Sequence, residues 1–106
     1  MITVTIYKDS GQYAGFTTRG HAGYAEEGFD IVCAAASALT INCLNSLEAF
    51  TEDSFRGEEK DGFVSCRFPQ ELSEQGRLLM DSMVLGLTDI ENSYGKPYIR
   101  IEIKEV

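Results

Sequence analysis

The chain has 106 residues, of which 43% are hydrophobic and 25% charged, and this size and composition predict a single folded domain over residues 1–106. Nine Lys and Arg stand against seventeen Asp and Glu, giving a net charge of −8, and no basic cluster occurs along the sequence. Because proteins bind nucleic acid largely through Lys and Arg at the phosphates, we expect no direct contact with RNA or DNA. The acidic surface either simply keeps the protein in solution or attracts a basic partner.

The N-terminus and the cysteines indicate a compartment. No apolar run approaches the roughly 20 residues of a membrane-spanning helix, and the first residues lack the basic start and apolar core of a signal peptide. The three cysteines, Cys33, Cys43 and Cys66, are an odd number without close pairing, which favours free thiols in a reducing compartment. We therefore expect a cytoplasmic protein with no membrane contact.

Two strands are predicted at the start of the chain. Ile2, Val4 and Ile6 alternate with more polar neighbours, which is the period of a half-buried strand. A turn at residues 9–11 and a second strand over about 13–20 then predict a hairpin. His21, the only histidine of the chain, follows at the end of that second strand.

A loop and a helix come next. Residues 21–30 are rich in Gly and acidic side chains, which suits neither helix nor strand, and function is often carried by such loops. Residues 33–50 are rich in Ala and Leu, and their apolar positions recur at steps of three and four residues. They predict the first helix, with Asp30 placed to cap its N-terminus.

The second half of the chain predicts two short strands, a helix and a last strand. The strands are expected at about 54–58 and 63–68 with a turn at 60–62, the helix at about 71–91, and the last strand at 99–103. The resulting order β-β-α-β-β-α-β favours an α/β (α+β) fold. We expect a two-layer sandwich, in which both helices cover one face of a mixed sheet of about five strands.

Cys33 has a position suited to a nucleophile. If Asp30 is the N-cap, Cys33 is the third helical residue, where the first-turn N–H groups and the helix dipole favour the reactive thiolate. The nearby carboxylates of Glu26, Glu27 and Asp30 oppose a second negative charge. The sequence leaves open which of the two effects is larger.

His21 is the candidate general base, because a cysteine nucleophile is normally activated by a base within hydrogen-bond reach. The loop between His21 and Cys33 is long enough to bring the helix start back beside the end of the strand. The alternative is that Cys33 is a buried structural cysteine and His21 a satisfied polar group. Cys43 and Cys66 lie on apolar faces of the predicted helix and strand, so we expect both in the core.

Three neighbours are candidates for supporting the site or binding a substrate. Gly20 would let the backbone turn sharply or let a substrate come close. Ala34 leaves room beside the nucleophile, although Ala is also simply the best helix former. Ser37 lies one turn after Cys33, where its hydroxyl could bond a substrate, support the loop or bond back to its own helix.

The sequence indicates no metal and no cofactor. Its His and Cys residues lack the paired ligand spacing of zinc sites. It also contains no Cys-x-x-Cys pair, no Gly-rich phosphate loop and no Gly-x-Ser-x-Gly elbow.

The segment that carries Cys33 and His21 resembles a known family. Residues 20–23 read Gly-His-Ala-Gly, and residues 27–37 read Glu-Gly-Phe-Asp-Ile-Val-Cys-Ala-Ala-Ala-Ser. This combination of a Gly-His pair, a spacing of twelve residues to the Cys, an Asp three residues before it and a Ser four residues after it closely resembles the signature of the bacterial ribosomal-processing cysteine proteases, the Prp family. The length and the element order of the chain resemble that family from end to end.

The resemblance implies a cysteine endopeptidase in which His21 and Cys33 are the catalytic pair and Asp30 and Ser37 are signature positions. It further implies removal of an N-terminal extension from large-subunit ribosomal protein number twenty-seven during ribosome assembly, by a small α/β sandwich that forms homodimers. We expect first-turn N–H groups near Cys33 to stabilise the oxyanion. Asp30 is the nearest candidate in sequence to orient His21, and we expect substrate to order the loop at residues 22–30.

Two other functions stay open at this point. One is a cysteine hydrolase or acyltransferase acting on a small molecule, which would use the same pair in a closed pocket. The other is a non-catalytic module that binds a ribosomal protein, in which Cys33 is structural.

Overall fold

The computed structural model describes residues 1–26 and 28–106. It contains five strands and two helices in the predicted order. They are β1 (Ile2–Asp9), β2 (Gln12–Arg19), α1 (Ile31–Phe50), β3 (Arg56–Lys60), β4 (Phe63–Arg67), α2 (Glu74–Tyr94) and β5 (Ile99–Glu105). The predicted order of the elements is confirmed, and the main displacement is α2, which begins and ends about three residues later than expected.

The bounds of α2 follow from its two caps. Ser73 is the N-cap, and its hydroxyl oxygen accepts from the Gly76 amide at 3.0 Å. The Asp53 carboxylate holds Ser73 in place by accepting from its amide at 3.0 Å and from its hydroxyl at 2.7 Å. Gly95, with a φ of 96°, ends the helix in a backbone conformation that favours glycine. Because Asp53 lies twenty residues before Ser73, sequence periodicity alone did not reveal this start.

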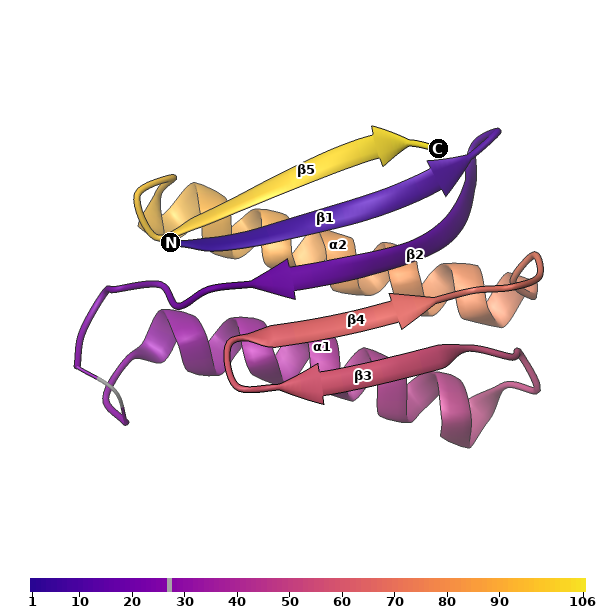
Figure 1. The fold of residues 1–106 in the computed structure, drawn as a ribbon, viewed down its shortest axis with the longest axis horizontal. Coiled ribbons are helices and arrows are strands. Elements are labelled where there is room, and N and C mark those ends of the chain that lie inside the picture. Colours follow the sequence, from indigo (N-terminus) through magenta and orange to yellow (C-terminus); the bar gives the residue numbers. More distant parts are fainter. Residues whose placement is uncertain (27) are drawn as a thin grey trace.

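The strands form one mixed sheet in the order β3-β4-β2-β1-β5, in which only the β1–β5 pair is parallel. Both helices lie behind the sheet in the view of Figure 1, with α1 behind β3 and β4 and α2 behind the other strands. The predicted two-layer sandwich is therefore confirmed. Within the described ranges, no helix or strand covers the opposite face of the sheet.

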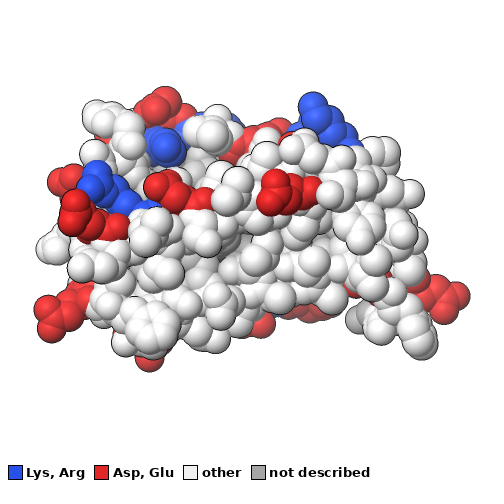
Figure 2. All heavy atoms as spheres, turned by 180° about the vertical axis from the view of Figure 1, so that it is seen from behind, with Lys and Arg blue, Asp and Glu red and all other residues white. Residues whose placement is uncertain are grey.

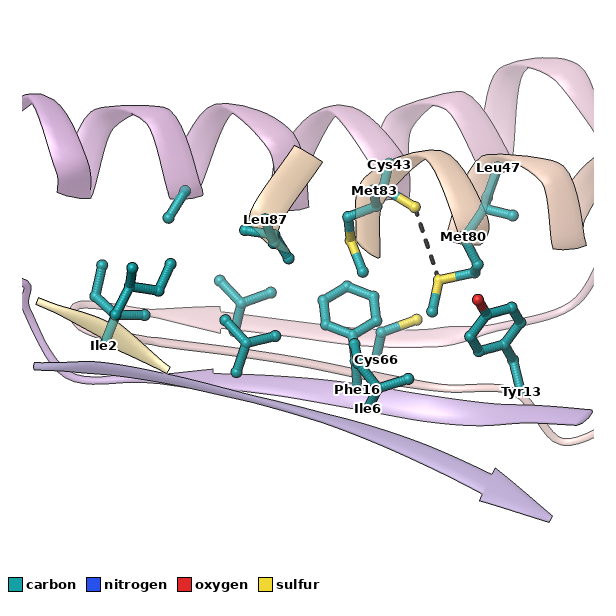
Figure 3. Packing of buried hydrophobic residues seen from close by; sticks show 14 of the residues in the cluster. Ile2, Ile6, Tyr13, Phe16, Cys43, Leu47, Cys66, Met80, Met83 and Leu87 are labelled. Carbon is teal, nitrogen blue, oxygen red and sulfur yellow. Dashed lines mark hydrogen bonds between the residues drawn. The ribbon is translucent and has the colours of Figure 1, made fainter. Parts of the chain in front are cut away.

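The core fills the space between the sheet and the helices (Figure 3). Its largest fully buried side chains are Phe16, Ile6, Leu47, Met80, Leu87, Ile99, Val4, Val32 and Thr40. Cys43 and Cys66 are also buried, so the prediction that both are core residues is confirmed. Figure 3 shows the Cys43 sulfur directed at Met80, with the two sulfur atoms 3.8 Å apart.

Helix α1 is long and apolar. By length and composition alone it could cross a membrane, so the expectation that no apolar run approaches a membrane-spanning helix is wrong for residues 31–50. The physical reason is its content of Ala, Leu and Ile. This is weak evidence for a membrane span, because the core helix of a soluble protein passes the same test. Here one stripe of α1 faces the core with Val32, Ala36, Thr40, Cys43 and Leu47.

Candidate functional site

The start of α1 is fixed by Asp30, as predicted. Asp30 is the N-cap, and one oxygen of its carboxylate accepts hydrogen bonds from the amides of Val32 and Cys33, both at 3.0 Å. Cys33 is therefore the third residue of the helix and lies in its first turn, also as predicted. Cys33 thus lies at the helix N-terminus, the end that favours negative charge.

The second oxygen of Asp30 holds the preceding loop. It accepts from the Tyr24 amide at 2.9 Å and from the Ala25 amide at 3.3 Å. Burial by itself would raise the pKa of Asp30, but these four N–H donors outweigh it and hold the pKa below its usual value. One carboxylate thus joins the helix start to the loop, and it faces backbone amides instead of His21. The expectation that Asp30 orients His21 is wrong for this structure.

A second anchor of the loop is aromatic. The Tyr24 ring packs edge-on against the rings of Tyr94 and Tyr98, with centroids 5.4 Å and 5.2 Å apart. Both partners lie near the junction of α2 and β5. The loop is therefore attached on its N-terminal side, whereas the expected ordering by substrate stays a prediction. Glu27, one of the acidic side chains weighed above, lies outside the described residues.

His21 follows the end of β2 and is held there through the backbone of Gly20. The Gly20 amide donates to the Gly62 carbonyl oxygen in the β3–β4 turn at 2.8 Å. Gly20 has a φ of 89°, and a Cβ added to it would collide with the carbonyl oxygen of Met1. A side chain is thus excluded at this position on two grounds, which explains a glycine directly before His21.

The Cys33 sulfur receives a backbone hydrogen bond from the segment that carries His21. The amide of Ala22, which is a buried residue, donates to Cys33 Sγ at 3.1 Å. An N–H group that points at the sulfur stabilises negative charge on it. The contact also shows that the end of β2 and the start of α1 lie side by side, as expected from the length of the loop.

The imidazole of His21 faces the β3–β4 turn. Its Nε2 lies 3.9 Å from Oδ1 of Asp61, and a Cβ added to Gly62 would come within 3.0 Å of the same nitrogen. Within the described part of the chain, no hydrogen bond joins His21 to Cys33. The His21 side chain is 60% exposed, so its ring has room to turn toward the sulfur.

Cys33 lies between two hollows in the surface. One, of about 490 Å³, extends between the sheet and α1, and the other, of about 390 Å³, extends toward the loop. The residues that line both are His21, Cys33, Ser37 and Asp61. A half-buried sulfur with space on two sides suits a chain that passes across it better than a compact molecule in a closed pocket.

The other predicted site residues take different positions. Ser37 is exposed and borders both hollows beside Cys33, and no hydrogen bond occupies its hydroxyl among the described residues. Ala34 is exposed and lines the hollow toward the loop. The first-turn amides do not fit the oxyanion role expected of them. Those of Val32 and Cys33 bond to the Asp30 carboxylate, and that of Ala34 donates to the Asp30 carbonyl oxygen at 3.0 Å.

Two groups at the site were missed from the sequence. The amide of Ala22 carries no sequence signal, because any residue but proline has an N–H group. Asp61 lies forty residues after His21, in a turn that was predicted but not connected with the site. Across the described residues, no group of three or more His, Cys, Asp or Glu side chains could hold a metal ion.

Comparison with known proteins identifies the family. Residues 1–100 match the family model described as cysteine protease Prp. The chain belongs to the cysteine protease Prp family. It is 31% identical to the ribosomal processing cysteine protease Prp of Staphylococcus aureus, over 98% of this chain and all of that protein. It is 32% identical to the protein of the same name from Bacillus subtilis, over 89% of this chain and 90% of that protein.

Solved structures of Prp proteins agree with this assignment. Prp from S. aureus in complex with a covalently linked product peptide has a TM-score of 0.91 and 32% identity, covering 98% of this chain and all of that one. The same protease with a substrate peptide has a TM-score of 0.86, at 31% identity and with the same coverage. The resemblance to the family is thus confirmed, and the chain is a cysteine protease.

Cys33 is expected to react with iodoacetamide well before the other two cysteines. Burial raises the pKa of Cys43 to about 11, and burial together with the charge of Cys43 raises the pKa of Cys66 to about 12. At pH 7.5 fewer than about one in a thousand of those two thiols is ionised. Peptide mapping by mass spectrometry should find the label on Cys33 alone at pH 7.5, and on Cys43 and Cys66 only in urea. Equal labelling of all three in the native protein would contradict the described burial.

Replacing Asp30 should separate its two tasks. Asn keeps one oxygen to cap α1 but presents an NH₂ group to the amides of Tyr24 and Ala25, whereas Ala removes both acceptors. We expect Asp30→Ala to lower the Tm by roughly 4–8 °C, and Asp30→Asn to lower it less while still reducing kcat/KM.

The pH dependence of the Tm provides the control for this pair. The pKa of Asp30 is lower in the folded chain, so its contribution is fully present above its unfolded value and is lost as the pH falls through the folded one. The Tm difference between wild type and Asp30→Asn should therefore shrink toward pH 3. A Tm difference that does not change with pH would show that the negative charge of Asp30 does not contribute to stability.

Proposed function

We propose that this chain is the endopeptidase that removes the N-terminal extension of large-subunit ribosomal protein number twenty-seven during ribosome assembly, with Cys33 as nucleophile and His21 as general base. Relatives from S. aureus and B. subtilis are ribosomal processing cysteine proteases by name. The observation that carries the proposal is the position of Cys33 at the start of α1, between two hollows that it shares with His21.

The reaction begins with a proton transfer. His21 takes the proton of the Cys33 thiol, and the sulfur attacks the carbonyl carbon of the scissile bond. Because Nε2 of His21 faces Asp61, the other ring nitrogen, Nδ1, is left to approach the sulfur. The imidazolium then gives its proton to the leaving amine, the acyl-enzyme remains on Cys33, and water releases it. An exposed pair such as His21 and Asp61 contributes little to stability.

The amide of Ala22 is the best placed oxyanion donor. It already points at Cys33 Sγ from 3.1 Å, so it lies close to where the carbonyl oxygen sits once its carbon is bonded to the sulfur. Ser37 borders the same space, and its hydroxyl supplies a second donor or holds the peptide backbone. These two groups replace the first-turn amides, which are engaged by Asp30.

The charge near the cleft suits a basic substrate. Glu59 and Asp61 line the larger hollow, and Asp30 and Asp61 line the smaller one. Lys60, the one basic side chain among those that line either hollow, pairs with Glu58 at 2.8 Å. Ribosomal proteins are generally basic, so acidic groups beside the cleft would speed their approach.

The assay that tests this function uses a peptide that spans the junction of the extension. We expect cleavage by the wild type, loss of at least about a thousandfold in kcat/KM for Cys33→Ala, and a loss of roughly 10²–10⁴ for His21→Ala. Cys43→Ala is the matched control, because it removes a buried thiol that lines neither hollow and should retain activity. Mass spectrometry would identify the cut bond.

Three outcomes would contradict the proposal in different ways. Cleavage that survives Cys33→Ala would exclude the nucleophile. Binding of the peptide without cleavage would favour a binding module. Hydrolysis of small thioesters or esters without cleavage of the peptide would favour a small-molecule hydrolase.

We also propose that the protein works as a cytoplasmic homodimer. All three cysteines are free, which fits a reducing compartment. The exposed side of α2 carries Leu78 and Leu85, which are 69% and 65% exposed and seven residues apart. Seen from the helix side, Figure 2 shows few charged groups in the middle of that face. A face of this kind is typical of an interface.

Light scattering after size exclusion should give twice the mass of one chain for the wild type. Leu78→Ser with Leu85→Ser should shift the mass to that of one chain without lowering the Tm by more than a few degrees, because both side chains are exposed. Phe50→Ser is the control, since Phe50 is 75% exposed but lies on α1. A monomeric wild type would contradict the dimer.

A further inference from the structure

The open face of the sheet gathers most of the basic residues of this acidic chain. Residues that alternate with the buried ones along β1, β2, β4 and β5 point away from the helices, as do their register partners on β3, where every residue is exposed. Six of the nine Lys and Arg occupy such positions, and all six are exposed. They are Arg19, Arg56, Lys60, Arg67, Arg100 and Lys104. The strands place only two carboxylates on the same face, Glu58 and Glu102. The face therefore carries about +4 and leaves −12 on the remainder.

The strand register arranges these side chains in rows across all five strands. One row reads Lys60, Phe63, Arg19, Thr3 and Arg100. A second row, four residues further along the strands, reads Arg56, Arg67, Gly15, Tyr7 and Lys104. The row between them reads Glu58, Ser65, Thr17, Thr5 and Glu102. Two rows with three cations and one aromatic ring each thus enclose a row of hydroxyl groups.

The cations of this face are largely unpaired. Among the residues that the structure describes, only Lys60 has a carboxylate partner, Glu58. Arg56 and Arg67 stand directly opposite each other on neighbouring strands. Like charges in that arrangement lower the stability of the folded chain, so folding does not account for this pair of arginines. An anionic ligand would remove the repulsion.

A hollow of about 580 Å³ lies on this face between the two basic rows. Tyr7, Thr17, Arg19, Phe63 and Arg67 are among the residues that line it. Gly15, which has no side chain, separates Arg67 from Tyr7 and leaves the space open. The Arg19 guanidinium lies over the Phe63 ring at 4.7 Å, so the hollow offers two flat surfaces, Tyr7 and the Arg19 plane.

We propose that the open face of the sheet binds single-stranded RNA. The phosphates would pair with the two basic rows, and a base would stack in the hollow on Tyr7 or on the Arg19 guanidinium. Sheet faces with basic and aromatic side chains bind single-stranded RNA in this way. An acidic protein partner would need only the positive charge of this face. The flat stacking surfaces and the row of hydroxyl groups suit, in addition, the bases and the ribose 2′-hydroxyl groups of RNA.

This surface is separate from the protease cleft. The cleft opens at the start of α1, and only Lys60 and Phe63, at the β3–β4 turn, border both it and the basic face. The second basic row, with Arg56, Arg67 and Lys104, has no residue in the lining of the cleft. The expectation of no nucleic-acid contact was based on the absence of a basic cluster along the sequence. The sheet forms one from cations on four strands, β2, β3, β4 and β5, which span residues 12–105 of the chain.

Fluorescence anisotropy with a labelled twelve-nucleotide RNA of mixed sequence, in 50–200 mM salt, tests the proposal. Arg67→Gln with Lys104→Gln removes two cations of one row. Arg77→Gln with Lys96→Gln is the matched control, because it changes the net charge equally on α2 and in the loop that follows it. We expect the first pair to weaken binding about tenfold or more and to reduce the slope of log K against log salt by about 1.4, and the control pair to change binding less than about twofold.

Two further measurements exclude loss of folding as the cause. Both double variants should cleave the substrate peptide as the wild type does, because none of the four residues lines the cleft. Arg56→Gln should leave the Tm unchanged or raise it while weakening RNA binding, since it relieves the repulsion with Arg67.

Four results would overturn the proposal. They are no binding by the wild type at 50 mM salt, equal losses in the two double variants, equal affinity for single-stranded DNA of the same sequence, and displacement of the RNA by polyglutamate at an equal concentration of charge. The last result would indicate an acidic protein as the partner. Each result is independent of peptide cleavage, so the protease function stands or falls separately.

Discussion

The Asp30 carboxylate is the interaction on which the site depends. It binds four backbone amides, two at the start of α1 and two in the loop. Without it, the first turn of α1 would lose its cap and the loop would lose its attachment to that turn. The sulfur of Cys33 would then no longer be held against the amide of Ala22. A single ionised side chain therefore sets the position of Cys33, and its charge is stabilised by the same donors.

The second half of the site is built by contacts between hairpins. The β3–β4 turn brings Asp61 and Gly62 against the imidazole of His21, and the Gly62 carbonyl holds the amide of Gly20. His21 is thus attached to the sheet, whereas Cys33 is attached to the helix layer. The cleft lies where these two layers meet at one end of the sandwich.

Acidic and basic side chains are concentrated on different surfaces of the molecule, and the net charge does not reveal this. Acidic groups line the cleft, and six of the nine Lys and Arg lie on the open face of the sheet. A net charge of −8 predicts how the molecule behaves at a distance, because charges average out over many ångströms. A bound partner instead interacts with the charge of the surface that it touches, and that local charge depends on how the strands are paired.

The sequence by itself determined the order of the elements, the cap at Asp30, the place of Cys33 in the first helical turn and the core positions of Cys43 and Cys66. These features depend on periodicity and on neighbours within a few residues. Only the tertiary structure decided that Ala22 points at the sulfur, that Asp61 faces His21, that Asp53 fixes the start of α2, and that six cations share one face. Each of these features joins residues that are far apart in the chain. A local sequence pattern cannot predict them, because it does not determine which distant segments pack together.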